Sequence, residues 1–217
     1  MHQSINNLVS IKDTLKLQNI DLNKINIIAI SKTFPINEIS PLINYEQIHF
    51  GENKVQEAIE KWTEIKKDFK HIKLHMIGKL QSNKVKFVVP LFDYIHSLDS
   101  LKLAKKISDE QNKIAKKLKI FIQVNIGNEE QKNGINESEL EEFHKKCVID
   151  FGLDIIGLMC LPPKNDDTKE HFIKMNNLAS KIKVKELSMG MSNDYLEAAK
   201  HGATFLRIGS KIFGNRS

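Results

Sequence analysis

The chain has 217 residues and a formal net charge of +6, with 41% hydrophobic and 28% charged residues, which is the balance of a soluble globular protein. This length fits one large domain, so we expect residues 1–217 to form a single domain with its own core. No apolar stretch approaches the ~20 residues of a membrane span, and the N-terminal residues lack the apolar core of a signal peptide. We therefore expect a cytoplasmic protein.

In chain order, short apolar runs alternate with longer amphipathic stretches. The pattern predicts a helix over 4–17, a strand over 25–31, a helix over 36–44, a strand over 47–51, a helix over 54–67, a strand over 74–78, a helix over 81–91, a strand over 94–98, a helix over 100–118, a strand over 120–126, a helix over 137–150, a strand over 155–160, a helix over 168–182, a strand over 186–189, a helix over 193–201 and a strand over 204–208. This alternation indicates a parallel sheet with right-handed crossovers. Eight units favour an α/β fold of the (β/α)8 TIM barrel type, although a doubly wound open sheet has the same periodicity.

The cysteines and the basic residues give no sign of a metal or a nucleic acid partner. Cys147 and Cys160 form no C-x-x-C pair and have no histidine cluster at ligand spacing, so we predict reduced thiols and no metal site. The lysines are dispersed and alternate with acidic or amide residues, as on solvated helix faces. An RNA-binding barrel would need a basic patch and salt-sensitive binding, which the sequence does not predict.

Lys32 ends the first apolar run, I-N-I-I-A-I-S-K-T-F-P. In a barrel, functional groups collect at the carboxyl ends of the strands. A lysine placed there is partly desolvated, which lowers its pKa and leaves an amine that can form a Schiff base. The alternative is that Lys32 only marks the point where a core strand meets solvent.

Other strand ends carry polar residues with two possible roles each. Asn53 follows the second predicted strand, and His75 lies in the third. Both are candidates for the mouth of the barrel, but Asn53 could simply cap a helix and His75 could be a core histidine with satisfied hydrogen bonds.

Two late segments are suited to an anion. In S-M-G-M-S-N-D, from Ser188, a glycine permits close backbone approach and Ser192 supplies a hydroxyl just before a helix. In R-I-G-S, Arg207 is followed by Gly209 and Ser210. Barrels often bind phosphate with the loops after the seventh and eighth strands. The sequence lacks G-x-G-x-x-G and Walker motifs, so a lysine, a phosphate site and an arginine together favour pyridoxal 5'-phosphate as the cofactor.

The ordered motifs resemble those of one family nearly end to end. They are A-I-S-K-T from Ala29, H-F-G-E-N-K-V-Q-E-A from His49, H-M-I-G-K-L-Q-S-N-K from His75, V-N-I-G from Val124 with Q-K-N-G from Gln131, G-L-M-C-L-P-P from Gly157, L-S-M-G-M-S-N-D from Leu187 and R-I-G-S-K-I-F-G-N-R from Arg207. In these segments the chain resembles the pyridoxal phosphate homeostasis proteins, also called the YggS or proline synthetase co-transcribed type.

This resemblance implies a single-domain barrel like the N-terminal domain of alanine racemase. It further implies that Lys32 holds the cofactor as a Schiff base and that Arg207 lies near the pyridine nitrogen. The residues implied near the phosphate are Ser192, Gly209 and Ser210, and those implied in the lining are Asn53, His75, Ser188 and Met189.

We expect a cofactor-binding protein and assign no catalytic residue. An arginine opposite the pyridine nitrogen disfavours its protonation, which weakens the ring as an electron sink. Barrel relatives take a second acid or base from a C-terminal domain and a dimer partner. We expect neither in these 217 residues, and therefore expect a monomer that buffers the cofactor or delivers it to apoenzymes. The alternative is a low-activity racemase or lyase that uses His75 or Tyr195 as the acid or base.

Overall fold

The computed structural model describes residues 2–129, 131, 133–163 and 166–214. One residue of the Q-K-N-G motif, Lys132, lies outside the described residues. The strands are β1 (Asn26–Ile30), β2 (His49–Glu52), β3 (Lys73–Met76), β4 (Tyr94–Leu98), β5 (Lys119–Val124), β6 (Asp154–Cys160), β7 (Glu186–Ser188) and β8 (Phe205–Ile208). The helices are α1 (Gln3–Leu17), α2 (Ile36–Asn44), α3 (Val55–Asp68), α4 (Val85–Leu91), α5 (Leu101–Ile114), α6 (Leu140–Ile149), α7 (Thr168–Lys181), α8 (Tyr195–Lys200) and α9 (Ser210–Phe213), with short 3-10 turns at Leu22–Lys24, Ser82–Lys84 and Glu137–Glu139.

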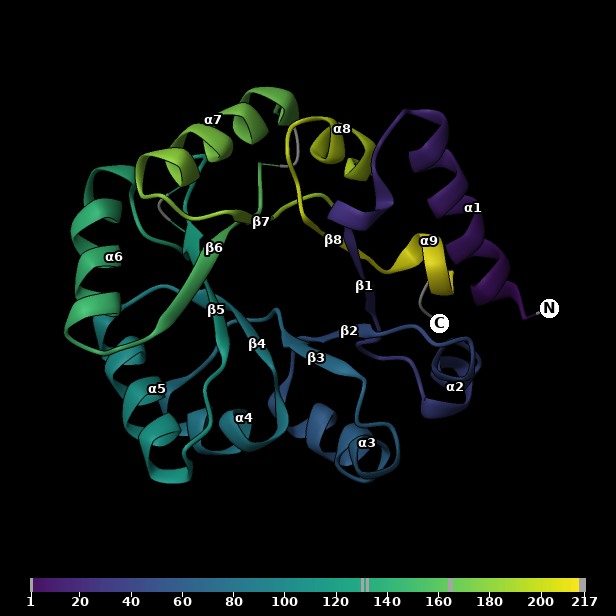
Figure 1. Ribbon diagram of the computed structural model, residues 1–217, viewed down its shortest axis with the longest axis horizontal. Helices are drawn as coiled ribbons and strands as arrows, with labels where there is room; N and C mark the ends of the chain where they lie inside the picture. Colours follow the sequence, from purple (N-terminus) through teal and green to yellow (C-terminus); the bar gives the residue numbers. More distant parts are fainter. Residues whose placement is uncertain (1, 130, 132, 164–165, 215–217) are drawn as a thin grey trace.

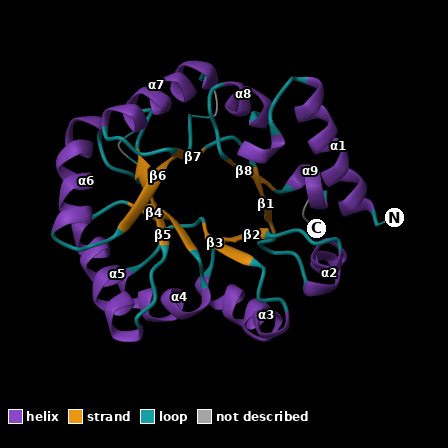
Figure 2. Ribbon diagram, viewed as in Figure 1, coloured by secondary structure: helices purple, strands orange, loops and turns teal. Residues whose placement is uncertain are grey.

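The strands form a closed parallel barrel in the order β1 to β8, surrounded by helices (Figures 1 and 2). Pairing of β1 with β8, from Asn26 opposite Phe205 to Ala29 opposite Ile208, closes the ring. This closure confirms the predicted (β/α)8 barrel over the open sheet. No helix among the described residues is long and apolar enough to cross a membrane.

The predicted strands and helices are all present, and the largest differences are at the start of α4 and the end of α5. We predicted a helix over 100–118, but α5 ends at Ile114 because Ala115 adopts a left-handed conformation with φ of 52°. The Leu118 amide then donates to the side chain of Gln111, which is 1% exposed. The chain is thus turned early into β5.

Packing on the two sides of the strands gives two groups of buried side chains. The larger group lies between strands and helices and includes Trp62, Phe92 and Phe172, all with 0% exposure. The smaller apolar group consists of Ile28, Ile30, Tyr94, Phe121, Met159 and Phe205, which come from the strands. Gly157 permits close approach of β6 to β7, because a Cβ there would lie 2.0 Å from the Glu186 carbonyl oxygen.

Candidate functional site

A cavity of about 1060 Å³ gathers residues from the carboxyl ends of several strands and the loops after them. Six of the nine residues that the sequence nominated line it: Lys32, Asn53, Ser192, Arg207, Gly209 and Ser210. They follow or end β1, β2, β7 and β8, which are brought together by barrel closure. The cavity therefore combines the predicted lysine, both predicted anion loops and the predicted arginine.

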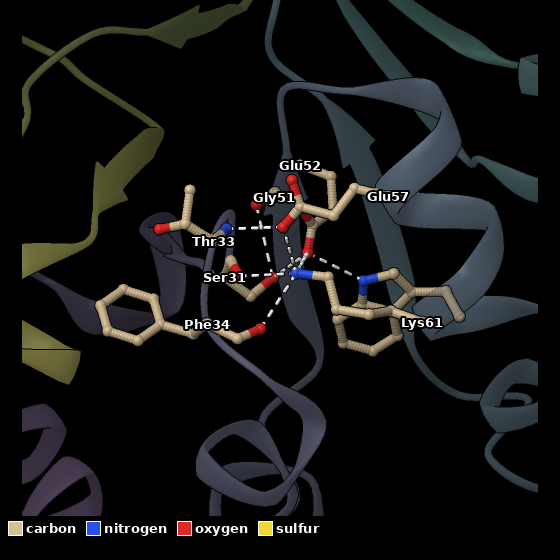
Figure 3. A network of polar contacts seen from close by, with 8 residues as sticks. Ser31, Thr33, Phe34, Gly51, Glu52, Glu57 and Lys61 are labelled. Atoms are coloured by element: carbon tan, nitrogen blue, oxygen red, sulfur yellow. Dashed lines mark hydrogen bonds and ion pairs between the residues drawn. The ribbon is translucent and has the colours of Figure 1, made fainter. Parts of the chain in front are cut away.

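The turn that carries Lys32 is fixed by a polar cluster that binds its neighbours Ser31, Thr33 and Phe34 (Figure 3). Lys61 of α3 donates to the carbonyl oxygens of Ser31 at 2.8 Å and Phe34 at 3.2 Å, so it binds the backbone on both sides of Lys32. Thr33 has a left-handed φ of 69°, a conformation that a β-branched residue rarely adopts. The surrounding contacts must therefore hold the turn in place.

Two carboxylates complete this cluster. Glu52 Oε1 accepts from the Ser31 hydroxyl at 2.8 Å and lies 2.9 Å from Lys61 Nζ, while Glu57 Oε1 lies 2.7 Å from the same ammonium group. Glu57 also accepts the Thr33 amide at 2.5 Å. Burial alone would raise the pKa of Glu57, but the hydrogen bonds from Lys61 and Thr33 lower it below its ordinary value. The cluster thus joins α3 to the Lys32 turn.

The anion corner lies where the loops after β7 and β8 meet. Ser192 Oγ accepts the backbone amides of Gly209 at 3.3 Å and Lys211 at 3.4 Å. Gly190 has a φ of 84°, and a Cβ there would lie 2.5 Å from the Ala198 Cβ. Two amides from the start of α9 are therefore directed at one oxygen in the cavity wall. This donor set suits a phosphate oxygen.

Arg207 is held at the cavity by two uncharged acceptors. Its Nη1 donates to Ser188 Oγ at 2.7 Å and its Nη2 donates to the Cys160 carbonyl at 2.8 Å. The side chain is 4% exposed, and burial lowers the pKa of the guanidinium from its ordinary value. An arginine remains protonated in proteins, so the cavity has a fixed positive charge at the end of β8.

Three nominated residues lie behind the cavity instead of lining it. His75, Ser188 and Met189 have 0% exposure and are not among the lining residues. Both ring nitrogens of His75 are hydrogen-bonded, to His49 and His96. Of the two roles that the sequence allowed for His75, the core histidine with satisfied hydrogen bonds is the one that the structure has.

The cavity has features that fit an anionic aldehyde cofactor. Asn53 Oδ1 is buried without a hydrogen-bond partner, and such an atom costs free energy until a donor reaches it. Lys32, Lys79 and Arg207 line the cavity together with the acidic Asp194, so the charged lining is mainly positive. In the part of the chain that the structure describes, no group of three or more His, Cys, Asp or Glu side chains is arranged to hold a metal ion.

Sequence reasoning missed the supporting residues of the site. Glu52 and Glu57 lie within the quoted G-E-N-K-V-Q-E segment, and Glu57 and Lys61 have the i,i+4 spacing of a helical ion pair. That spacing was a usable signal for the pair. Nothing in the sequence indicated that Lys61 would also bind the carbonyls beside Lys32.

Known protein families match this sequence. The alanine racemase N-terminal domain family matches residues 18–217. The pyridoxal phosphate homeostasis protein of Pasteurella multocida (strain Pm70) is 36% identical over 202 residues, which cover 88% of this chain and 87% of the relative. The protein of the same name from Escherichia coli (strain K12) is 34% identical over 202 residues, covering 89% and 86%. The chain belongs to the pyridoxal phosphate homeostasis protein family.

Solved structures agree with this membership. PipY of Synechococcus elongatus PCC7942, in a structure with pyridoxal phosphate bound, has a TM-score of 0.87 and 32% identity, covering 98% of this chain and all of PipY. Alanine racemase of Clostridium difficile 630 has a TM-score of 0.75 at 15% identity, with 98% of this chain and 56% of the racemase covered. The second likeness shows the shared barrel fold alone.

Proposed function

We propose that this protein binds pyridoxal 5'-phosphate, holds it as a Schiff base on Lys32, and buffers or delivers the cofactor without robust catalysis. The observation that carries the proposal is the meeting of Lys32, the Ser192 corner and Arg207 in one cavity. When bound, pyridoxal phosphate supplies an electrophilic aldehyde. The Lys32 amine would hold the cofactor through that aldehyde.

The remaining residues would each take one part of the cofactor. The amides of Gly209 and Lys211 and the hydroxyls of Ser192 and Ser210 suit the phosphate, because charge-assisted hydrogen bonds are the strong ones. Arg207, which can only donate, suits an unprotonated ring nitrogen. Asn53 Oδ1 suits a donor group on the ligand. The relatives' shared name and the bound pyridoxal phosphate in PipY support this assignment.

The racemase or lyase alternative finds less support. It needs an acid or base at the ring, and the sequence offered His75 and Tyr195 for that role. Both ring nitrogens of His75 are engaged in the barrel interior. Tyr195 is 4% exposed and does not line the cavity. We therefore favour a homeostasis role, with apoenzymes as recipients, and retain a monomer in the cytoplasm as part of the proposal.

The phosphate gives a direct test of this function. In the Ser192→Ala, Ser210→Ala double variant, the dissociation constant for pyridoxal phosphate should rise by about thirtyfold, corresponding to ~2 kcal/mol for lost hydrogen bonds to a charged group. Binding of unphosphorylated pyridoxal should barely change. Dialysis of each protein against both ligands, followed by absorbance of the retained ligand, measures this.

A matched control is Ser180→Ala, on an exposed position of α7 outside both anion loops. It should retain both ligands as the parent does. Equal losses of both ligands in the double variant would mean that the two loops shape the cavity without binding phosphate. No retention of pyridoxal phosphate by the parent protein would overturn the proposed function itself.

A further inference from the structure

A line of hydrogen bonds runs through the barrel from β2 to β8. His49 Nδ1 lies 2.9 Å from His75 Nε2, and His75 Nδ1 lies 2.9 Å from His96 Nε2. His96 Nδ1 lies 2.8 Å from Ser188 Oγ, the same oxygen that accepts from Arg207. The line connects the guanidinium at the cavity with a half-buried histidine at the amino end of β2.

The direction of donation that gives the Ser188 hydrogen an acceptor within this line starts at its arginine end. Arg207 has donors and no acceptor, so Ser188 Oγ must accept from it and can give its own hydrogen to His96 Nδ1. A neutral His96 then carries its hydrogen on Nε2 and donates to His75 Nδ1. By the same reasoning, His75 carries its hydrogen on Nε2 and donates to His49 Nδ1.

The surroundings keep these rings neutral and oriented. Burial first, and then the charge of the Arg207 guanidinium, holds the pKa of His96 well below its ordinary value. Burial likewise lowers the pKa of His75. The His75 ring stacks on Tyr94 with centroids 4.2 Å apart, and the His96 ring stacks on Phe121 at 4.3 Å. Stacked rings of this kind cannot turn to exchange their nitrogens without disturbing the interior.

We propose that His96, supported by His75 and His49, is a positioning residue that presents the Ser188 oxygen to Arg207 and so aims the guanidinium at the cofactor ring. This inference rests on the proposed function, because it assigns Arg207 to the ring of pyridoxal phosphate. Both acceptors of the guanidinium are uncharged, so its direction depends on where their lone pairs point. A hydroxyl can rotate, and His96 is the contact that removes that freedom from Ser188.

The competing explanation is that the three histidines only fill the barrel interior with satisfied polar groups. A filling role requires buried rings with partners, but no particular tautomer and no effect on Arg207. The positioning role requires all three rings to carry hydrogen on Nε2 and requires an acceptor at the place of His96 Nδ1. These requirements can be measured separately.

The tautomers can be read in the protein without any cofactor. We would label the histidine ring nitrogens with 15N and record two-bond 1H–15N correlations near neutral pH, assigning His49, His75 and His96 with single substitutions. The expected result is three neutral rings, each protonated on Nε2. A hydrogen on Nδ1 of His75 or His96, or a charged ring at either position, would overturn the proposal.

A pair of substitutions of similar shape tests the effect on Arg207. His96→Asn places an amide oxygen near the former Nδ1 and can still accept from Ser188, whereas His96→Leu cannot. With 15N-labelled arginine, the parent and His96→Asn should show slow rotation of the Arg207 guanidinium, and His96→Leu should show fast rotation. The dissociation constant for pyridoxal phosphate should rise about tenfold or more in His96→Leu and less than about threefold in His96→Asn.

His144→Leu on α6 is the matched control, because this half-buried histidine belongs to another element and does not take part in the line. It should leave Arg207 rotation and cofactor binding as in the parent. If His96→Asn and His96→Leu weakened pyridoxal phosphate binding equally, the histidines would only fill the interior, which would contradict the positioning role. If the parent took up no pyridoxal phosphate, the proposed function would fail, while the tautomers and guanidinium rotation would still decide whether the line exists.

Discussion

Replacing Lys61 with methionine should destabilise the protein by several kcal/mol, because it removes the only ammonium group described between Glu52 and Glu57. Glu52 has no exposed side-chain surface and Lys61 is 11% exposed, so the ion pair at 2.9 Å is buried. Removing one partner of a buried ion pair costs about 3–5 kcal/mol, since an uncompensated charge stays inside. The lost hydrogen bonds to Ser31 and Phe34 also release the turn that carries Lys32.

The matched control is Lys67→Met on the same helix. Lys67 pairs with Glu64, and their side chains are 64% and 78% exposed. The free energy of unfolding should therefore fall by only about 0–1 kcal/mol. Urea unfolding followed by circular dichroism gives both free energies. Adding Glu52→Gln to Lys61→Met should recover part of the loss, because it removes the stranded charge. If both single variants lost less than about 1 kcal/mol, the cluster would not be the structural support that we infer.

Two further predictions concern backbone conformation and acid stability. Gly190→Ala should destabilise the fold, because the φ at this position is 84° and the new Cβ would lie 2.5 Å from the Ala198 Cβ. Gly209→Ala should keep the stability of the parent, because its Cβ would meet no atom closer than 3.4 Å. Thermal unfolding of the two variants checks this, and equal midpoints would count against it. Burial, assisted by Lys73, lowers the pKa of His49 to about 4. As the pH falls, His49 is therefore protonated at a higher pH in the unfolded chain than in the folded protein. Stability should therefore drop between about pH 6.5 and 4, by ~3 kcal/mol from this residue alone. Urea unfolding across this range should show a shallower pH dependence in His49→Asn, and an unchanged dependence would contradict the assignment.

The barrel could be predicted because the sequence repeats one pattern eight times. Buried runs such as 94–98 and 155–160 are bounded by clear turn and helix signals, and the observed strands differ from the predicted ones by at most two residues at either end. The placement of Lys32, Ser192 and Arg207 followed from the rule that parallel strands in a barrel present their carboxyl ends at one mouth.

The interior of the barrel could not be predicted in the same way. Strands buried on both faces read as continuous apolar runs, so periodicity does not tell which residues point inward. His49, His75 and His96 come from three strands and meet only when the barrel closes. Lys61 and the Ser31 carbonyl are likewise 30 residues apart. Contacts of this kind depend on three-dimensional proximity that no local pattern encodes.

The most direct test of the proposed function is the identity of the residue that bonds to the cofactor. The purified protein would be incubated with pyridoxal phosphate, reduced with borohydride, digested and analysed by mass spectrometry. We expect the cofactor on the peptide that contains Lys32, and none in Lys32→Ala, although that variant should remain folded. Modification of Lys79 or Lys211 instead, or no covalent modification of the parent, would contradict the assignment of Lys32.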